Sequence, residues 1–262
     1  MREIERVWKN PGFWFAVFLG VFSMLYPHMD TFVFREDPLG YFASADFLYF
    51  MLMPLQYGLA KLLLPFIAVF PAATFLAEDQ KRRHHLMMLH RTGMWGYMRQ
   101  RMMLSVFAAM LAAALGFLAY AVFAGFACPW HENVITSWRE LSGGTFDAWV
   151  NQYEGLPFLA FSLLCLCVSA AVWSLFGFSI ACFTSNTGLV IGGTFLLHYM
   201  ASWCFSRIIH HSEWSPMVLQ APSTHFTGSV WRIVLRLSVW LAVSAAIAVG
   251  CAGGFVRRMK EA

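Results

Sequence analysis

Residues 75–101 read FLAEDQKRRHHLMMLHRTGMWGYMRQR and lie between two long apolar stretches. This stretch, called the basic segment below, contains six of the 18 Lys and Arg residues of the chain: Lys81, Arg82, Arg83, Arg91, Arg99 and Arg101. A Lys or Arg at the centre of a bilayer costs about 2.5–3.5 kcal/mol on insertion scales. We therefore expect the basic segment to lie outside the hydrocarbon and the apolar stretches beside it to cross the membrane.

The composition of the whole chain is that of a membrane protein. Hydrophobic residues make up 59% of the 262 residues and charged residues only 12%, whereas a soluble domain has roughly 25% charged residues. The 26 Phe and 11 Trp residues are typical of a protein with aromatic side chains at both bilayer interfaces. We predict an all-α integral membrane protein that contacts lipids, has no nucleic-acid partner and begins without a cleavable signal peptide.

Six apolar segments are long enough to cross a bilayer, and they form a single domain over residues 1–262. A crossing helix needs about 20 residues, and runs of this length indicate helices because irregular backbone is not tolerated in hydrocarbon. Pro27, His28 and Asp30 interrupt the first segment, so its apolar core is residues 13–26. The expected spans are residues 12–34, 56–77, 102–126, 157–183, 188–205 and 230–256.

The distribution of Lys and Arg predicts which side of the membrane each connection occupies. Twelve of these residues lie in the N-terminal flank, the basic segment and the C-terminal flank, and six lie on the other side: Arg35, Lys61, Arg139, Arg207, Arg232 and Arg236. Positively charged flanks stay in the cytoplasm. Both termini are therefore expected to be cytoplasmic, and an even number of spans agrees with that orientation.

The connections between spans are expected to contain short interfacial helices. Residues 35–55 and 127–155 mix polar and aromatic residues, and a further short helix is expected at residues 92–99, in the plane of the inner interface. Residues 206–229 contain Pro216 and Pro222, so we expect this connection to fold back rather than form one helix. Residues 184–187 form a tight inner turn.

The six cysteines do not form a disulfide framework by their pattern. Four of them lie inside apolar runs, where Cys behaves as a small apolar residue: Cys165, Cys167, Cys182 and Cys251. Cys128 and Cys204 both fall near the outer surface, and whether they pair is left open.

The basic segment has a recognisable order of residue types. Phe75 and Glu78 are followed by the apolar run 86–89 and then by Arg91, Tyr97 and Arg101. This order resembles the cytoplasmic element of type-2 ABC exporter permeases, and the six-span layout of the whole chain is similar to theirs. The segment departs from that family at DQKRRHH, where a Gly and a Thr often follow the acidic residue.

The resemblance implies that the basic segment docks into a cleft on a separate ATP-binding subunit. Glu78 would mark the inner end of the second span, and residues 86–88 would pack against the gate or the partner. Arg91, Trp95 and Tyr97 would form the contact surface, with Arg101 opening the third span. The alternatives are a solvated Glu78, an Arg91 that binds lipid phosphate, and Trp95 and Tyr97 in an aromatic belt.

Nucleotide binding is not expected in this chain, because it contains no Gly-rich phosphate loop ending in Gly-Lys-Ser/Thr. The resemblance therefore implies a permease subunit without enzymatic activity or a cofactor of its own. ATP and Mg²⁺ would be bound by the partner ATPase, and a second copy of this permease or a related one would complete the translocation path. The expected location is the cytoplasmic membrane of a prokaryote.

Other functions remain open at this stage. A non-transport scaffold or immunity protein would have no distinguishing pattern. An intramembrane enzyme is disfavoured because the spans contain almost no carboxylates. His198 lies within the fifth span, where it is expected either to hydrogen-bond to a neighbouring helix or to face the transport path. The groups at residues 84–90 and 210–213 lack the spacing of a metal site, so no metal is expected.

Overall fold

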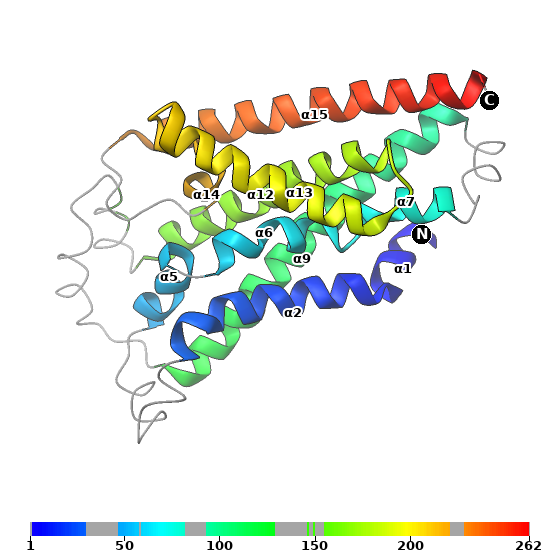
Figure 1. The fold of residues 1–262 in the computed structure, drawn as a ribbon. Helices are drawn as coiled ribbons and strands as arrows, with labels where there is room; N and C mark the ends of the chain where they lie inside the picture. The colour runs from blue at the N-terminus through cyan, green and yellow to red at the C-terminus, as the bar shows by residue number, and fades with distance from the viewer. Residues whose placement is uncertain are drawn as a thin grey trace.

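The computed structural model describes residues 2–29, 47–57, 59–81, 93–128, 146, 149, 155–220 and 228–261. Within these residues the chain is helical, with no β-strand. Long helices lie side by side in one bundle, and both ends of the chain lie at the same end of it (Figure 1). That end is called the terminal end below.

The chain begins with two helices joined by a single residue. α1 (Arg2–Lys9) is followed by α2 (Pro11–Leu25), and Asn10 between them caps α2 by accepting a hydrogen bond from the Gly12 N–H at 3.0 Å. The 3₁₀ turn η1 (Tyr26–His28), which contains Pro27, follows α2 directly. α2 has 15 residues, or about 22 Å of helix, which is shorter than a full crossing. Residues 30–34 of the expected first span lie outside the described residues.

The expected second span, residues 56–77, is interrupted. α5 (Phe47–Tyr57), α6 (Ala60–Val69) and α7 (Thr74–Lys81) follow one another, and residues 70–73 form a turn between the last two. Pro71 in this turn has no N–H to continue a helix, and the Asn10 amide donates a hydrogen bond to its carbonyl at 3.0 Å.

The third span is longer than expected. α9 (Met94–Ala127) has 34 residues, so it is about 51 Å long, against about 30 Å for the hydrocarbon core of a bilayer. The expectation of a separate short helix at residues 92–99 is wrong, because residues 94–99 are the first turns of α9. Gly93 precedes the helix with a φ of 70°, a conformation that favours glycine.

The remaining long helices are α12 (Leu156–Ala181), α13 (Thr187–Trp203) and α15 (Val230–Glu261). Three short pieces follow α13: the π-helical turn η3 (Cys204–Ile208), the 3₁₀ turn η4 (Ser212–Trp214) and α14 (Pro216–Leu219). Over residues 204–220 the connection is thus broken into turns, as its proline predicted. Cys204 is a free thiol, so it does not pair with Cys128.

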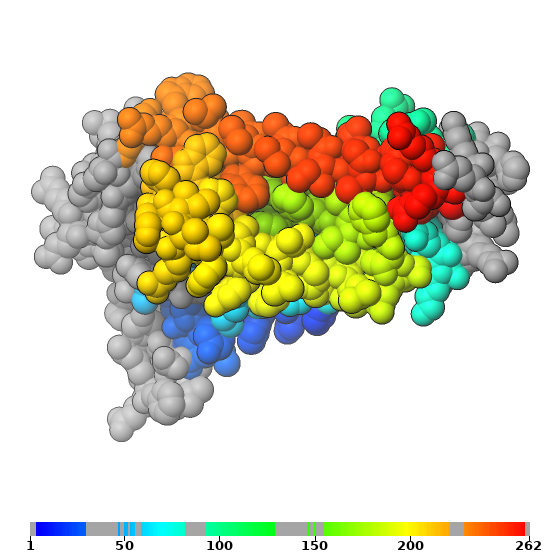
Figure 2. Space-filling view, turned by 45° about the horizontal axis from the view of Figure 1, so that its top comes forward, coloured from blue at the N-terminus to red at the C-terminus, as the bar shows by residue number. Residues whose placement is uncertain are grey.

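The most buried parts of the bundle are α12 and the segment Ala60–Lys81, which contains α6 and α7. In the most apolar 18-residue stretch of each segment, 78% of α12 and 72% of Ala60–Lys81 are buried, compared with 39% in α9 and 22% in α13 and in α15. α13 and α15 form much of the face seen in Figure 2, with large apolar side chains outward, as lipid-facing helices have. α2 crosses α9 closely where Gly20 meets Gly116, since a Cβ on Gly20 would lie 3.2 Å from the Gly116 Cα.

Five helical segments in the described part of the chain are long and apolar enough to cross a membrane. They are Ala60–Lys81, Met94–Ala127, Leu156–Ala181, Thr187–Ile208 and Val230–Met259. The protein is therefore an all-α protein with the features of a multi-pass membrane protein. The sixth span and the cytoplasmic placement of the termini remain predictions.

Candidate functional site

A buried carboxylate at the terminal end of the bundle gathers three donors from two other helices. Asp79, near the end of α7, is 1% exposed. Its Oδ1 lies 2.9 Å from Arg6 Nη2, and its Oδ2 lies 2.8 Å from Arg101 Nη2. The Tyr97 hydroxyl donates a hydrogen bond to the same Oδ2 at 2.9 Å. These four residues, the Asp79 cluster, join α1, α7 and α9.

The two arginines of the Asp79 cluster differ in their exposure to solvent. The Arg101 side chain is 4% exposed and that of Arg6 is 34% exposed. A buried charge is tolerated when it is paired, and removing one partner of a buried pair costs about 3–5 kcal/mol. Arg6 also lies over the Phe75 ring at 4.6 Å, and Arg101 over the Tyr97 ring at 5.3 Å. The cluster is therefore held by ion pairs, a hydrogen bond and aromatic contacts.

Helix geometry explains why these side chains meet. Tyr97 and Arg101 are four residues apart on α9, so they share one face of that helix. Phe75 and Asp79 have the same spacing on α7, and both are buried. On α1, Arg6 precedes the buried Val7 and reaches Asp79 from the edge. Arg6 and Asp79 are thus each placed near a buried apolar side chain of the same helix, Val7 on α1 and Phe75 on α7.

Two further side chains tie neighbouring helices together at the same end. Gln80 of α7 donates to the Ala181 carbonyl at 2.8 Å, and Arg258 of α15 donates to the Cys182 carbonyl at 2.7 Å. These carbonyls belong to the end of α12, where the last carbonyls have no partner within the helix. In the short loop that follows, Asn186 caps α13 by accepting a hydrogen bond from the Gly188 N–H.

The residues expected at a docking surface occupy different environments. Tyr97 and Arg101 lie inside the Asp79 cluster and are 1% and 4% exposed, so in this structure they contact Asp79 rather than solvent. Trp95 is 54% exposed and lies beside Gly253 of α15, and Glu78 is half-buried. Arg91 and the expected apolar run 86–88 lie outside the described residues. Docking by these residues stays a prediction.

Sequence reasoning singled out Glu78 and missed its neighbour Asp79, along with Arg6. The spacing did not distinguish the two acidic residues, because Glu78 and Asp79 lie three and four residues after the buried Phe75 and both positions neighbour it on the helix surface. Arg6 had no signal either, because nothing in the sequence places α1 against α7.

His198 is fully buried, and its ring contacts a backbone carbonyl that has no donor within its own helix. Pro65 has no N–H, so the Lys61 carbonyl lacks its usual donor four residues later. His198 Nε2 lies 3.0 Å from that carbonyl oxygen, and Gln220 Nε2 donates to it at 2.8 Å. We call this arrangement the Lys61 junction. It corresponds to the first of the two expectations for His198, a hydrogen bond to a neighbouring helix.

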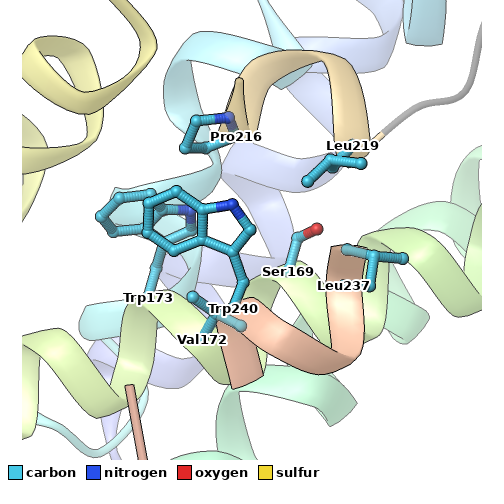
Figure 3. A pocket seen from close by; sticks show the side chains of 7 residues that line it. All are labelled: Ser169, Val172, Trp173, Pro216, Leu219, Leu237 and Trp240. Carbon is cyan, nitrogen blue, oxygen red and sulfur yellow. The ribbon is translucent and has the colours of Figure 1, made fainter. Parts of the chain in front are cut away.

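A small hollow, with a volume of about 10 Å³, lies between α12, α14 and α15 (Figure 3). Its lining is apolar except for one hydroxyl, and consists of Ser169, Val172, Trp173, Pro216, Leu219, Leu237 and Trp240. Trp173 also meets the His198 ring edge to face, with centroids 4.6 Å apart. The hollow has no pair of titratable groups for acid–base chemistry.

At the other end of α15, Arg236 reaches the short turns after α13. Arg236 Nη2 and His211 Nδ1 each lie 3.5 Å from a Glu213 oxygen, and Arg236 lies over the Trp214 ring at 5.7 Å. These contacts anchor η4 to α15. Within the described ranges, no three His, Cys, Asp or Glu residues come together as a metal site.

No protein-family model, no curated protein and no solved structure matches this chain. The resemblance to type-2 ABC permeases therefore stands on the order of residues and on the layout of the spans.

Proposed function

We propose that this chain is the membrane-spanning permease subunit of an ATP-driven ABC exporter in the cytoplasmic membrane of a prokaryote. A separate ATP-binding subunit docks at the terminal end of the bundle and supplies the ATP and Mg²⁺. Two permease subunits, either two copies of this chain or this chain and a related one, form the path. ATP-driven closure of the partner pair then exposes that path alternately to the two sides.

The Asp79 cluster is the observation that carries the proposal. Residues 82–92 connect α7 to α9, and the cluster pairs Asp79 on one side of this connection with Tyr97 and Arg101 on the other. A force applied to the connection therefore reaches two spanning segments through a charge-paired joint. Arg6 adds α1 to the joint, so the N-terminal helix moves with them.

The surface near this joint supports docking of a protein partner. Trp95 is 54% exposed in the first turn of α9, and Trp is among the residues that most often dominate binding at interfaces. α9 is about 20 Å longer than the hydrocarbon core, so its first turns extend beyond that core if the remainder crosses. The basic residues of the same region favour the cytoplasmic side.

Co-purification tests the proposal. The full-length chain is tagged, extracted from its native membrane in mild detergent, and examined for a co-purifying ATPase by mass spectrometry and for ATP turnover. We expect an ATPase in equal stoichiometry, and at least a tenfold loss of it with Trp95→Ala. Trp231→Ala is the matched control, because Trp231 is 78% exposed at the opposite end of α15.

Purification of the intact chain without any ATPase would overturn the proposal and would favour a non-transport membrane protein. Retention of the ATPase with Trp95→Ala, or its equal loss in both tryptophan variants, would overturn the assignment of Trp95 as a contact residue.

A further inference from the structure

The Lys61 junction places a hydrogen on His198 Nε2. A carbonyl oxygen only accepts hydrogen bonds, so the nitrogen 3.0 Å from it, His198 Nε2, must be the donor. In a neutral imidazole the other nitrogen then has an unprotonated lone pair. Gln220 is oriented in the same way, because its Nε2 donates to the same oxygen and its Oε1 points elsewhere as an acceptor.

Three polar atoms next to the Lys61 junction are buried and make no hydrogen bond to the part of the chain that the structure describes. They are His198 Nδ1, Ser202 Oγ and Gln220 Oε1, on residues that are 0%, 5% and 1% exposed. Buried polar atoms in proteins nearly always have a partner, either a protein group or an ordered water. The set consists of two acceptors and one hydroxyl.

Two of these atoms lie on one face of α13, and the third lies on a side chain that shares a hydrogen-bond partner with His198. His198 and Ser202 are four residues apart on α13, so they share a face with Cβ atoms about 5–6 Å apart. That separation can be bridged by one molecule making two hydrogen bonds of about 2.8 Å each. Gln220 lies alongside, because its amide and the His198 ring donate to one oxygen.

The surroundings favour a neutral ligand over a cation. The Trp173 ring covers the imidazole edge to face, and Pro216 and Leu219, which lead to Gln220, line the hollow beside Trp173 (Figure 3). None of the described side chains that form the junction or line the hollow is a carboxylate. A cation would therefore be buried without a counter-charge, which is unfavourable.

We infer that His198, Ser202 and Gln220 bind an internal water molecule that joins α13 to the connection after α14. The water donates one hydrogen to His198 Nδ1 and the other to Gln220 Oε1, and it accepts the hydroxyl hydrogen of Ser202. All three buried atoms then have partners, and water is the smallest molecule with this combination of two donors and an acceptor.

Solid-state NMR of the full-length chain in lipid nanodiscs, with ¹⁵N-labelled histidine, tests the inference. We expect magnetisation transfer from water to His198 Nδ1, together with a protonated Nε2. The His198→Gln variant lacks the two ring-nitrogen signals of His198 and thereby assigns them. Ser202→Ala should weaken the transfer at least threefold while leaving the Nε2 signal in place.

Ser244→Ala is the matched control, because Ser244 is also buried but its hydroxyl already donates to the Leu241 carbonyl at 3.0 Å. This variant should leave the transfer unchanged. Absence of transfer in the unmodified chain, or transfer that Ser202→Ala leaves unaltered, would overturn the site.

Discussion

The Asp79 cluster and the Lys61 junction bury polar groups in the same bundle by different means. The cluster joins three helices through a carboxylate and two guanidinium groups, whereas the junction satisfies one backbone carbonyl with two neutral side chains. Charged groups lose far more hydration on burial than neutral ones, so each depends more strongly on its partner. The cluster should therefore tolerate substitution less well than the junction.

The largest effect is expected from Asp79→Ala. This change leaves the buried Arg101 guanidinium without its carboxylate, and the expected loss in the free energy of unfolding is about 3–5 kcal/mol. The measurement is unfolding of the purified chain in mixed micelles as SDS is increased. Glu78→Ala is the control, and we expect it to stay within about 0.5 kcal/mol of the unmodified chain because Glu78 is half-buried.

Equal losses for the two acidic variants would show that the cluster is not a stabilising joint. The expectation that the charged Asp79 cluster tolerates substitution less well than the neutral Lys61 junction would then be wrong.

A smaller effect is expected at the Lys61 junction. His198→Phe removes one donor from the Lys61 carbonyl and should cost about 1–3 kcal/mol in the same unfolding assay. In a Pro65→Ala background the N–H at position 65 can donate to that carbonyl, so the cost of His198→Phe should fall by about 1 kcal/mol. Additive effects of the two changes would contradict the role assigned to Pro65.

The smallest effect is expected from Arg6→Ala. Arg6 is 34% exposed, and Asp79 keeps Arg101 and Tyr97 as partners, so we expect a loss of about 1 kcal/mol or less. Raising the salt concentration should shrink this loss, because partly exposed ion pairs are screened. A loss as large as that of Asp79→Ala would instead show that the Arg6 contact contributes as much to stability as the rest of the cluster.

The positions of most apolar helices could be predicted from the sequence. The expected spans 102–126, 157–183 and 230–256 each fall within or within two residues of an observed helix, because long apolar runs have only one stable backbone form in a bilayer. The second span was less predictable. A turn at residues 70–73 separates α6 from α7, and Asn10 and Arg6, both distant in sequence, contact the turn and α7.

The candidate site was predicted only in part. Tyr97 and Arg101 were selected for their residue types, but their role as contacts to a partner was inferred without knowing that both face Asp79. The pairing of Arg6 with Asp79 joins residues 73 positions apart. No periodicity within one helix contains information about such a distant contact.

The sequence by itself determined the helical, strongly apolar character of the chain, where its long apolar segments lie, and where its basic residues are concentrated. Those properties follow from the cost of moving each residue type between water and lipid, which is local. The tertiary structure alone decided that Asp79 rather than Glu78 is buried and that His198 serves the carbonyl released by Pro65. Such pairings depend on which helix faces meet, and only the packed bundle determines that.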